Sequence, residues 1–192
     1  MKRFFYFFFA FFMLTTLTQA QEEEEPRVLF SEINQVSGFG GPIFQFSTIG
    51  NDNAFFTGGG GAVLLNRRFW LGGYGMGLTS NVSFDETLEL DFGHGGFWLG
   101  YIVAPDKLIH INFQSTLGWG SVSYEDELTG NEVDEDGVFV INPQAEVEVN
   151  LTRWMRFGLA GGYRFVTGSD SSFDNNELSG ANAMLTLKFG WF

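Results

Sequence analysis

His94 and Ser115 are the residues of this sequence whose types best suit covalent catalysis. A serine hydroxyl acts as the nucleophile in ester hydrolysis when a histidine removes its proton. If Pro105 and Asp106 form a two-residue turn between antiparallel strands, His94 lies opposite Leu117 and diagonal to Ser115 on the same face. Two glycines follow His94 and no acidic residue is placed to orient its ring, so a hydrolase is the secondary hypothesis.

Charged residues alternate with apolar ones in the last third of the chain. Glu146 and Glu148 precede a short turn, and Arg156 follows it. If Asn150 pairs with Trp154 across this turn, Glu148 lies opposite Arg156 and Glu146 lies diagonal to it. Ions in a confined interior need charged, hydrogen-bonded partners. We therefore predict a structural ion cluster in the lumen. Its members are Glu146, Glu148, Arg156, Arg164, Lys188 and His110.

Two segments match ligand-binding loops only in part. EVDEDG, Glu132 to Gly137, has acids at alternate positions like the first half of a calcium loop, but the closing glutamate would fall at Pro143. GGGG, Gly58 to Gly61, lacks the Gly-Lys-Ser/Thr that completes a phosphate-binding loop. The sequence contains no cysteine, which excludes disulfides and thiolate ligands. We expect neither a metal nor a cofactor.

Runs with a period of two residues predict the elements that position these groups. In LIHINFQSTLGWG, Leu108 to Gly120, the odd positions are mostly apolar and the even ones polar or glycine, which indicates a β-strand with two distinct faces. Similar runs recur between turn signals. The candidate strands are Val36 to Ile49, Ala54 to Asn66, Phe69 to Ser80, Thr87 to Val103, Leu108 to Tyr124, Val138 to Asn150, Trp154 to Thr167 and Leu178 to Phe192.

The connections between these strands are of two kinds. Three are short and basic: Asn66 to Phe69, Ala104 to Lys107 and Asn150 to Trp154. Four are mostly longer and hold 13 acidic residues and no basic one: 50–53, 81–86, 125–137 and 168–177. An even number of antiparallel strands with turns at one end and loops at the other is typical of outer-membrane barrels. We predict an all-β fold, an eight-stranded antiparallel up-and-down transmembrane β-barrel.

In such a barrel the apolar face of each strand contacts lipid and the polar face lines the lumen. Ile109, Phe113 and Trp119 are then expected to face lipid, and His110, Asn112 and Gln114 the lumen. Aromatic girdles are expected where the wall meets water, formed by Trp70, Trp154 and Trp191 near the turns and Trp119 near the loops.

The same reasoning places His94 toward lipid and a set of glycines toward the lumen. These glycines lie in mid-strand or nearer the loops, where they could leave a cavity for a small ligand or relieve crowding in a narrow barrel. They are Gly58, Gly60, Gly73, Gly75, Gly77, Gly93, Gly95, Gly118, Gly120 and Gly180.

The amino-terminal region has the layout of a secretory signal. Lys2 and Arg3 precede an apolar run that ends at Leu14, and Ala20 closes the polar stretch after it. We predict a signal peptide over 1–20, an acidic linker over 21–35 and the barrel over 36–192. The chain has 10 basic and 23 acidic residues, and a chain this acidic is repelled by nucleic acid, so no nucleic-acid partner is expected.

The last residues, LTLKFGWF, end on an aromatic side chain, Phe192, after a strand that carries Phe189 and Trp191 on one face. With the strand pattern, this ending resembles the small outer-membrane β-barrels of Gram-negative bacteria, the OmpA/OmpX-like group. The resemblance covers roughly residues 36–192. It implies location in the cell outer membrane and recognition of Phe189, Trp191 and Phe192 by the barrel-assembly machinery. Gly190 departs from that group, which often has a tyrosine at this position.

Eight strands enclose only enough space for side chains or one small ligand. We therefore expect a non-enzymatic monomer with a structural role or a surface-interaction role through its acidic loops, in contact with outer-membrane lipids and lipopolysaccharide. Two alternatives stay open: a lipid hydrolase at His94 and Ser115, and a narrow binder or channel for a small solute.

Overall fold

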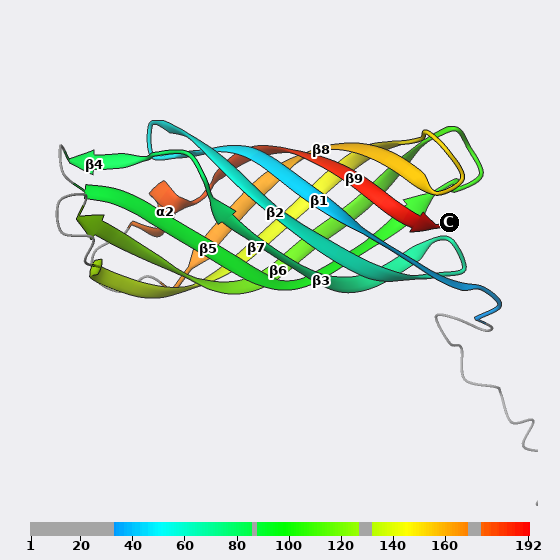
Figure 1. The fold of residues 1–192 in the computed structure, drawn as a ribbon, viewed down its shortest axis with the longest axis horizontal. Helices are drawn as coiled ribbons and strands as arrows, with labels where there is room; N and C mark the ends of the chain where they lie inside the picture. Colours follow the sequence, from blue (N-terminus) through cyan, green and yellow to red (C-terminus); the bar gives the residue numbers. More distant parts are fainter. Residues whose placement is uncertain (1–32, 86–87, 127–131, 169–173) are drawn as a thin grey trace, which may run out of the picture. The chain divides into compact units, whose positions relative to one another are not determined.

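The computed structural model describes residues 33–85, 88–126, 132–168 and 174–192 of the 192-residue chain. The predicted signal peptide and most of the predicted linker lie outside the described residues. The described part is almost entirely β-strand, and its strands form a closed antiparallel barrel (Figure 1).

Each strand pairs with its neighbours in the sequence, and the pairs β1–β9 and β3–β5 close the barrel. The short β4 also pairs with β5, so β3 and β4 together occupy one of eight positions around the wall. The predicted eight-stranded up-and-down β-barrel is confirmed. Its elements are β1 Val36–Ile49, β2 Asp52–Leu65, β3 Phe69–Leu78, β4 Ser83–Asp85, β5 Leu88–Val103, β6 Ile109–Asp126, β7 Glu132–Asn150, β8 Met155–Thr167, α2 Asn175–Leu178 and β9 Gly180–Trp191.

Two boundaries on the loop side differ from the prediction. The ladder between β6 and β7 continues to the pair Glu125 and Glu132, so most of the acidic segment expected as a loop is strand. Leu178 lies in the short helix α2, because the Asp174 carboxylate accepts a hydrogen bond from the backbone N–H of Asn176 and caps a helical turn there. Within the described ranges, no helix combines the length and apolar character needed to cross a membrane.

The two faces of β6 to β9 match the prediction. On β6, Ile109, Phe113 and Trp119 are more than half exposed on the outer wall, whereas His110 and Asn112 are buried in the lumen. This part of the wall therefore carries apolar side chains on the outside and mostly polar ones on the inside. This is the reverse of a soluble β-sandwich.

The predicted faces of β3 and β5 were wrong. The connection after β5 spans residues 104–108, with Ala104 in a left-handed conformation (φ 56°), so His94 pairs with Gly120 and not with Leu117. A shift by an odd number of residues exchanges the faces of a strand. Trp70, expected in a girdle, and His94, expected toward lipid, both point into the barrel and are buried.

The same exchange moves five of the predicted lumen glycines to the outer face. Around Gly75 and Gly77 a Cβ would meet nothing within 4 Å. The glycines that share the outward parity of β3 and β5 are Gly73, Gly75, Gly77, Gly93 and Gly95. Some of the glycines that do face inward lie against large side chains; a Cβ on Gly100 would overlap the Trp70 ring, and one on Gly118 would overlap the Tyr74 hydroxyl.

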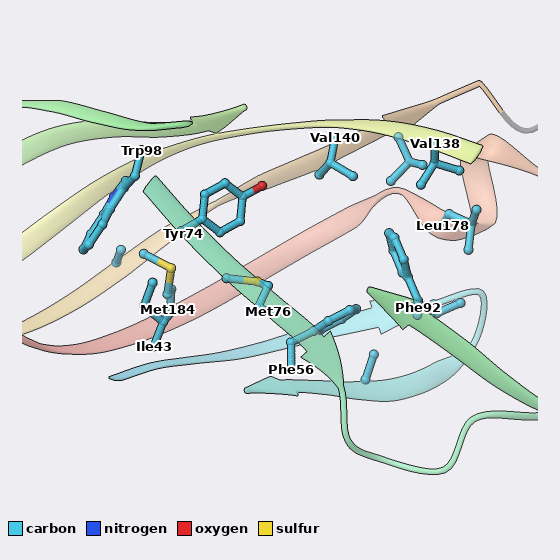
Figure 2. Close-up of a cluster of buried hydrophobic side chains, with 14 of the residues drawn as sticks. Ile43, Phe56, Tyr74, Met76, Phe92, Trp98, Val138, Val140, Leu178 and Met184 are labelled. Carbon is cyan, nitrogen blue, oxygen red and sulfur yellow. The ribbon is translucent and has the colours of Figure 1, made fainter. Parts of the chain in front are cut away.

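Apolar and aromatic side chains from β1, β2, β3 and β5 fill much of the lumen (Figure 2). Phe56, Met76 and Phe92 pack in the half nearer the loops, with the Phe56 and Phe92 rings edge to face at 5.5 Å. Of the two alternatives left open for the inward glycines, a ligand cavity in this half of the lumen is excluded, because these side chains occupy the space. An open space remains at the loop end of the barrel, where Ile49, Leu90 and Leu178 line it.

Gly100 and Gly75 form a matched pair for testing this packing. We expect Gly100→Ala to destabilise the barrel by about 1–3 kcal/mol, because its methyl group must displace the Trp70 ring. Gly75→Ala should be neutral or stabilising by about 0.5–1 kcal/mol, since alanine lowers the entropy of the unfolded chain and meets open space. Urea unfolding followed by tryptophan fluorescence would measure both, and equal effects would show that the lumen is not packed in this way.

Candidate functional site

The half of the lumen nearer the turns contains a cluster of buried ionisable side chains contributed by β6 to β9, called the ion cluster below. Glu146 and Glu148 project from β7, and Lys188 projects from β9 between them, with its Nζ 2.5 Å from Glu146 Oε1 and 2.6 Å from Glu148 Oε2. Arg156 and His110 complete the group, each 2.9 Å from Glu148 Oε1. All five side chains are almost completely buried.

Hydrogen bonds from amides and a hydroxyl complete the shells of both carboxylates. Asn112 Nδ2 donates to Glu146 Oε1 at 2.9 Å and to Glu148 Oε2 at 3.1 Å. Gln114 Nε2 and the Thr186 hydroxyl donate to Glu146 Oε2. Each carboxylate oxygen thus has two donors, which is what buried charges require. Gly158 makes room for this arrangement, because a Cβ there would come within 2.6 Å of the Glu146 carboxylate.

Aromatic rings from β1, β3 and β5, and the ring of Phe192 after β9, cover the cationic side of the cluster. Lys188 Nζ lies 5.0 Å from the Trp70 ring centroid and 5.5 Å from those of Phe39 and Trp98. The Arg156 guanidinium lies 3.8 Å from the ring centroid of Phe192. These are cation–π distances, so the aromatic wall stabilises the charges in addition to excluding water from them.

A chain of amide hydrogen bonds continues from the ion cluster toward the loops. Trp98 Nε1 donates to Gln114 Oε1 at 3.0 Å, and Gln114 Nε2 donates to Gln144 Oε1 at 3.2 Å. Gln144 donates to Asn182, Asn182 to Asn142, and Asn142 to Gln45 on β1. Side chains therefore cross-link the inner wall from β5 to β1.

The structure brings together five of the six residues predicted for the ion cluster: Glu146, Glu148, Arg156, Lys188 and His110. The predicted register was two residues off, since Asn150 pairs with Arg156 and Glu148 with Gly158. An even shift keeps every side chain on its face, so Arg156 still reaches Glu148. The amide chain and the aromatic cover were not predicted. Trp98 and Phe39 gave no signal because apolar residues occur on both faces of their strands.

Arg164 does not join the cluster and lies near the loops. Its Nε donates to the carbonyl of Leu178 at 3.0 Å and its Nη2 to the carbonyl of Thr48 at 3.1 Å. The rings of Phe56 and Phe92 lie 4.7 and 5.5 Å from its guanidinium carbon. Arg164 thus attaches α2 to the inner wall.

The hydrolase pair is not assembled. The His94 ring points into the barrel, where its Nδ1 is 2.8 Å from the Tyr74 hydroxyl. Ser115 pairs with Leu99 on β5 and lies on the outer face. A serine and a histidine on opposite sides of a β-barrel wall cannot exchange a proton, so this alternative was wrong.

The predicted assembly residues are divided between two environments. Phe189 and Trp191 point outward, and Trp191 is 81% exposed. Phe192 packs inward, stacked on Phe39 with ring centroids 5.9 Å apart. The part of the chain that the structure describes contains no group of three metal-ligating residues. The alternating acids of EVDEDG lie on β7, so they form no calcium-loop turn.

Comparisons with solved structures find two small proteins that share this fold. Neisserial surface protein A (NspA) superposes with a TM-score of 0.60 at 8% identity, over 81% of this chain and 96% of the other. Ail, the attachment invasion locus protein of Yersinia pestis, superposes with a TM-score of 0.52 at 11% identity, over 81% and 97%. No protein-family model matches the sequence, and a search of curated proteins finds no relative.

Lys188 is the residue whose loss should affect the ion cluster most. Lys188→Met leaves two buried carboxylates without their shared cation and should destabilise the barrel by about 3–5 kcal/mol. The double variant Lys188→Met with Glu146→Gln should recover part of that loss, because the substitution of Glu146 removes one of the two carboxylate charges that the loss of Lys188 leaves uncompensated. Urea unfolding in lipid vesicles would measure both variants.

Arg67→Gln is the control for this prediction. It breaks the exposed ion pair with Asp106, in which the atoms are 2.6 Å apart, and should cost about 1 kcal/mol or less. A Lys188→Met effect as small as that of Arg67→Gln would show that the buried cluster does not stabilise the fold.

Arg164→Met should release α2 without disturbing the ion cluster. The variant removes both hydrogen bonds to main-chain carbonyls and keeps most of the apolar stem. We expect faster amide hydrogen exchange at Leu178 and Ser179, with unchanged exchange in the centre of β6 and β7. Unchanged exchange at Leu178 would contradict the anchoring role.

Proposed function

We propose that this chain is a non-enzymatic outer-membrane barrel that presents its acidic loop end outside the cell and contacts external molecules there. The main support is the inverted distribution of side chains across the wall. Phe97, Phe113 and Leu159 are each more than half exposed on the outside, while the carboxylates and their cations are enclosed. An apolar belt of this kind is costly in water and stable against hydrocarbon.

The side chains at the two ends of the barrel support an orientation in which the strands cross the membrane. Trp154 and Trp191 lie on the outer wall at the turn end, and Trp119 lies nearer the loops, as interfacial anchors would. The turn end also carries the basic residues Arg68 and Arg153. The fold itself is that of small outer-membrane barrels, which supports the same location.

The filled lumen favours a structural and surface role over conduction of solutes. The ion cluster, the amide chain and the aromatic side chains together fill much of the interior. A barrel of eight strands is wide enough only for such a filling.

The charge of the loop end indicates the type of partner. Ail has been crystallised with a heparin analogue, sucrose octasulfate. In this chain the described residues at the loop end include Asp52, Glu135 and Glu177, whose charges would repel a polyanion. We therefore propose that the surface selects cationic partners.

Single cysteines provide a direct test, because the natural sequence contains none. Glu135→Cys places an exposed thiol near the loops, and Arg153→Cys places one at a turn. A membrane-impermeant maleimide should label Glu135→Cys on intact cells and Arg153→Cys only after the outer membrane is permeabilised. Equal labelling on intact cells, or recovery of the protein in the soluble periplasm, would contradict the proposal.

A further inference from the structure

The mouth of the barrel at the loop end contains a cavity of about 240 Å³. Part of its lining is apolar and comes from β1, from the connection before β4, from β5 and from α2. Ile49, Val82, Leu90 and Leu178 line it, and each is less than 9% exposed. These side chains are held in place by the barrel beneath, where Leu178 packs near Phe92 and Val138 (Figure 2).

The rim of the same cavity is acidic. Asp52, Asp174 and Glu177 contribute to its lining, and no lining residue is basic. One oxygen of Asp174 accepts the hydrogen bond that caps α2. Asp52 and Glu177 are exposed, so their charges face the entrance. The cavity thus combines a buried apolar patch with an entrance of negative potential.

Hydrogen bonds fix the segment that forms one side of the cavity. Gly50 N–H donates to the carbonyl of Glu177 at 2.8 Å, which ties α2 to the turn between β1 and β2. Arg164 holds the carbonyl of Leu178 from below. A site that is formed before binding loses less entropy when a ligand enters.

We propose that this mouth cavity binds a small organic cation that carries an apolar body, such as a primary ammonium attached to an aromatic ring. A cavity of about 150 Å³ is known to hold benzene, so the observed volume accommodates a ring with a short charged arm. The ring packs against Ile49, Leu90 and Leu178, and the ammonium faces Asp52 and Glu177. The inference extends the proposed surface function by assigning a site and a ligand class.

The test uses the full chain reconstituted in nanodiscs of a zwitterionic phospholipid, titrated with benzylammonium and followed by nuclear magnetic resonance. We expect saturable shifts of the methyl signals of Ile49, Leu90 and Leu178. Benzyl alcohol and benzoate have the same ring without the positive charge, and both should bind at least about fivefold more weakly. Val82→Phe should reduce the affinity by filling the cavity while leaving its charges in place.

A pair of double variants isolates the role of the rim. Asp52→Asn with Glu177→Gln should weaken benzylammonium binding about fivefold or more. Asp91→Asn with Glu135→Gln changes the net charge equally, outside this cavity, and should weaken binding by less than about twofold. Equal effects of the two double variants, or the absence of saturable shifts in the parent protein, would overturn the proposal.

A second titration separates the two sources of such a cation. A capped Lys-Phe dipeptide that binds more tightly than benzylammonium would identify a side chain of a partner protein as the occupant, and the reverse order would identify a free amine. Because these titrations are made on reconstituted protein, they test the cavity. Cysteine labelling on cells tests the location, so either proposal can fail without the other.

Discussion

The burial of two neighbouring carboxylates, Glu146 and Glu148, is the constraint on which the rest of this barrel depends. Neither can remain ionised in the lumen without cations at close distance, and the cations come from β8 and β9, with His110 on β6 as a further hydrogen-bond partner of Glu148. A slip of one residue in β9 would carry Lys188 to the outer wall and leave both charges uncompensated. The ion cluster therefore fixes the register of several strands at once, in addition to filling the interior.

The lumen is asymmetric around its axis, and this asymmetry explains where inward glycines are needed. The strands from β6 to β9 contribute the ions and most of the amides, whereas β1, β2, β3 and β5 contribute aromatic rings. Inward glycines such as Gly100 are needed where those rings approach the opposing backbone. No contact in the described part of the chain explains why Gly75 and Gly77, which face outward, are glycine.

The sequence predicted the fold and the polar half of the interior because polar and bulky apolar residues alternate along much of β6 to β9, most clearly in the half nearer the turns. On β3 and β5, glycines occupy many positions and aromatic residues occur on both faces, so alternation carries little information there. The length assumed for each turn decided which of the predicted side-chain positions were correct. A register error of two residues across the turn before Arg156 left every side chain on its predicted face, so the ion cluster was still recognised. A register error of three residues across the turn before Ile109 placed His94 on the wrong face and suggested a catalytic pair that does not exist. The mouth cavity had no sequence signal, because its walls come from four distant segments.

The position of the ion cluster also bears on how the barrel assembles. All five of its ionisable side chains belong to four consecutive strands at the carboxyl-terminal end of the chain. These strands can neutralise one another's charges as an open sheet, before the amino-terminal strands arrive. Side-chain hydrogen bonds then join β1 and β5 to that sheet through Gln45 and Trp98, and the remaining gain on closure comes from aromatic packing and the backbone ladder. The residues that pair the buried charges thus lie in one part of the chain, and the strands that close the barrel lie in another.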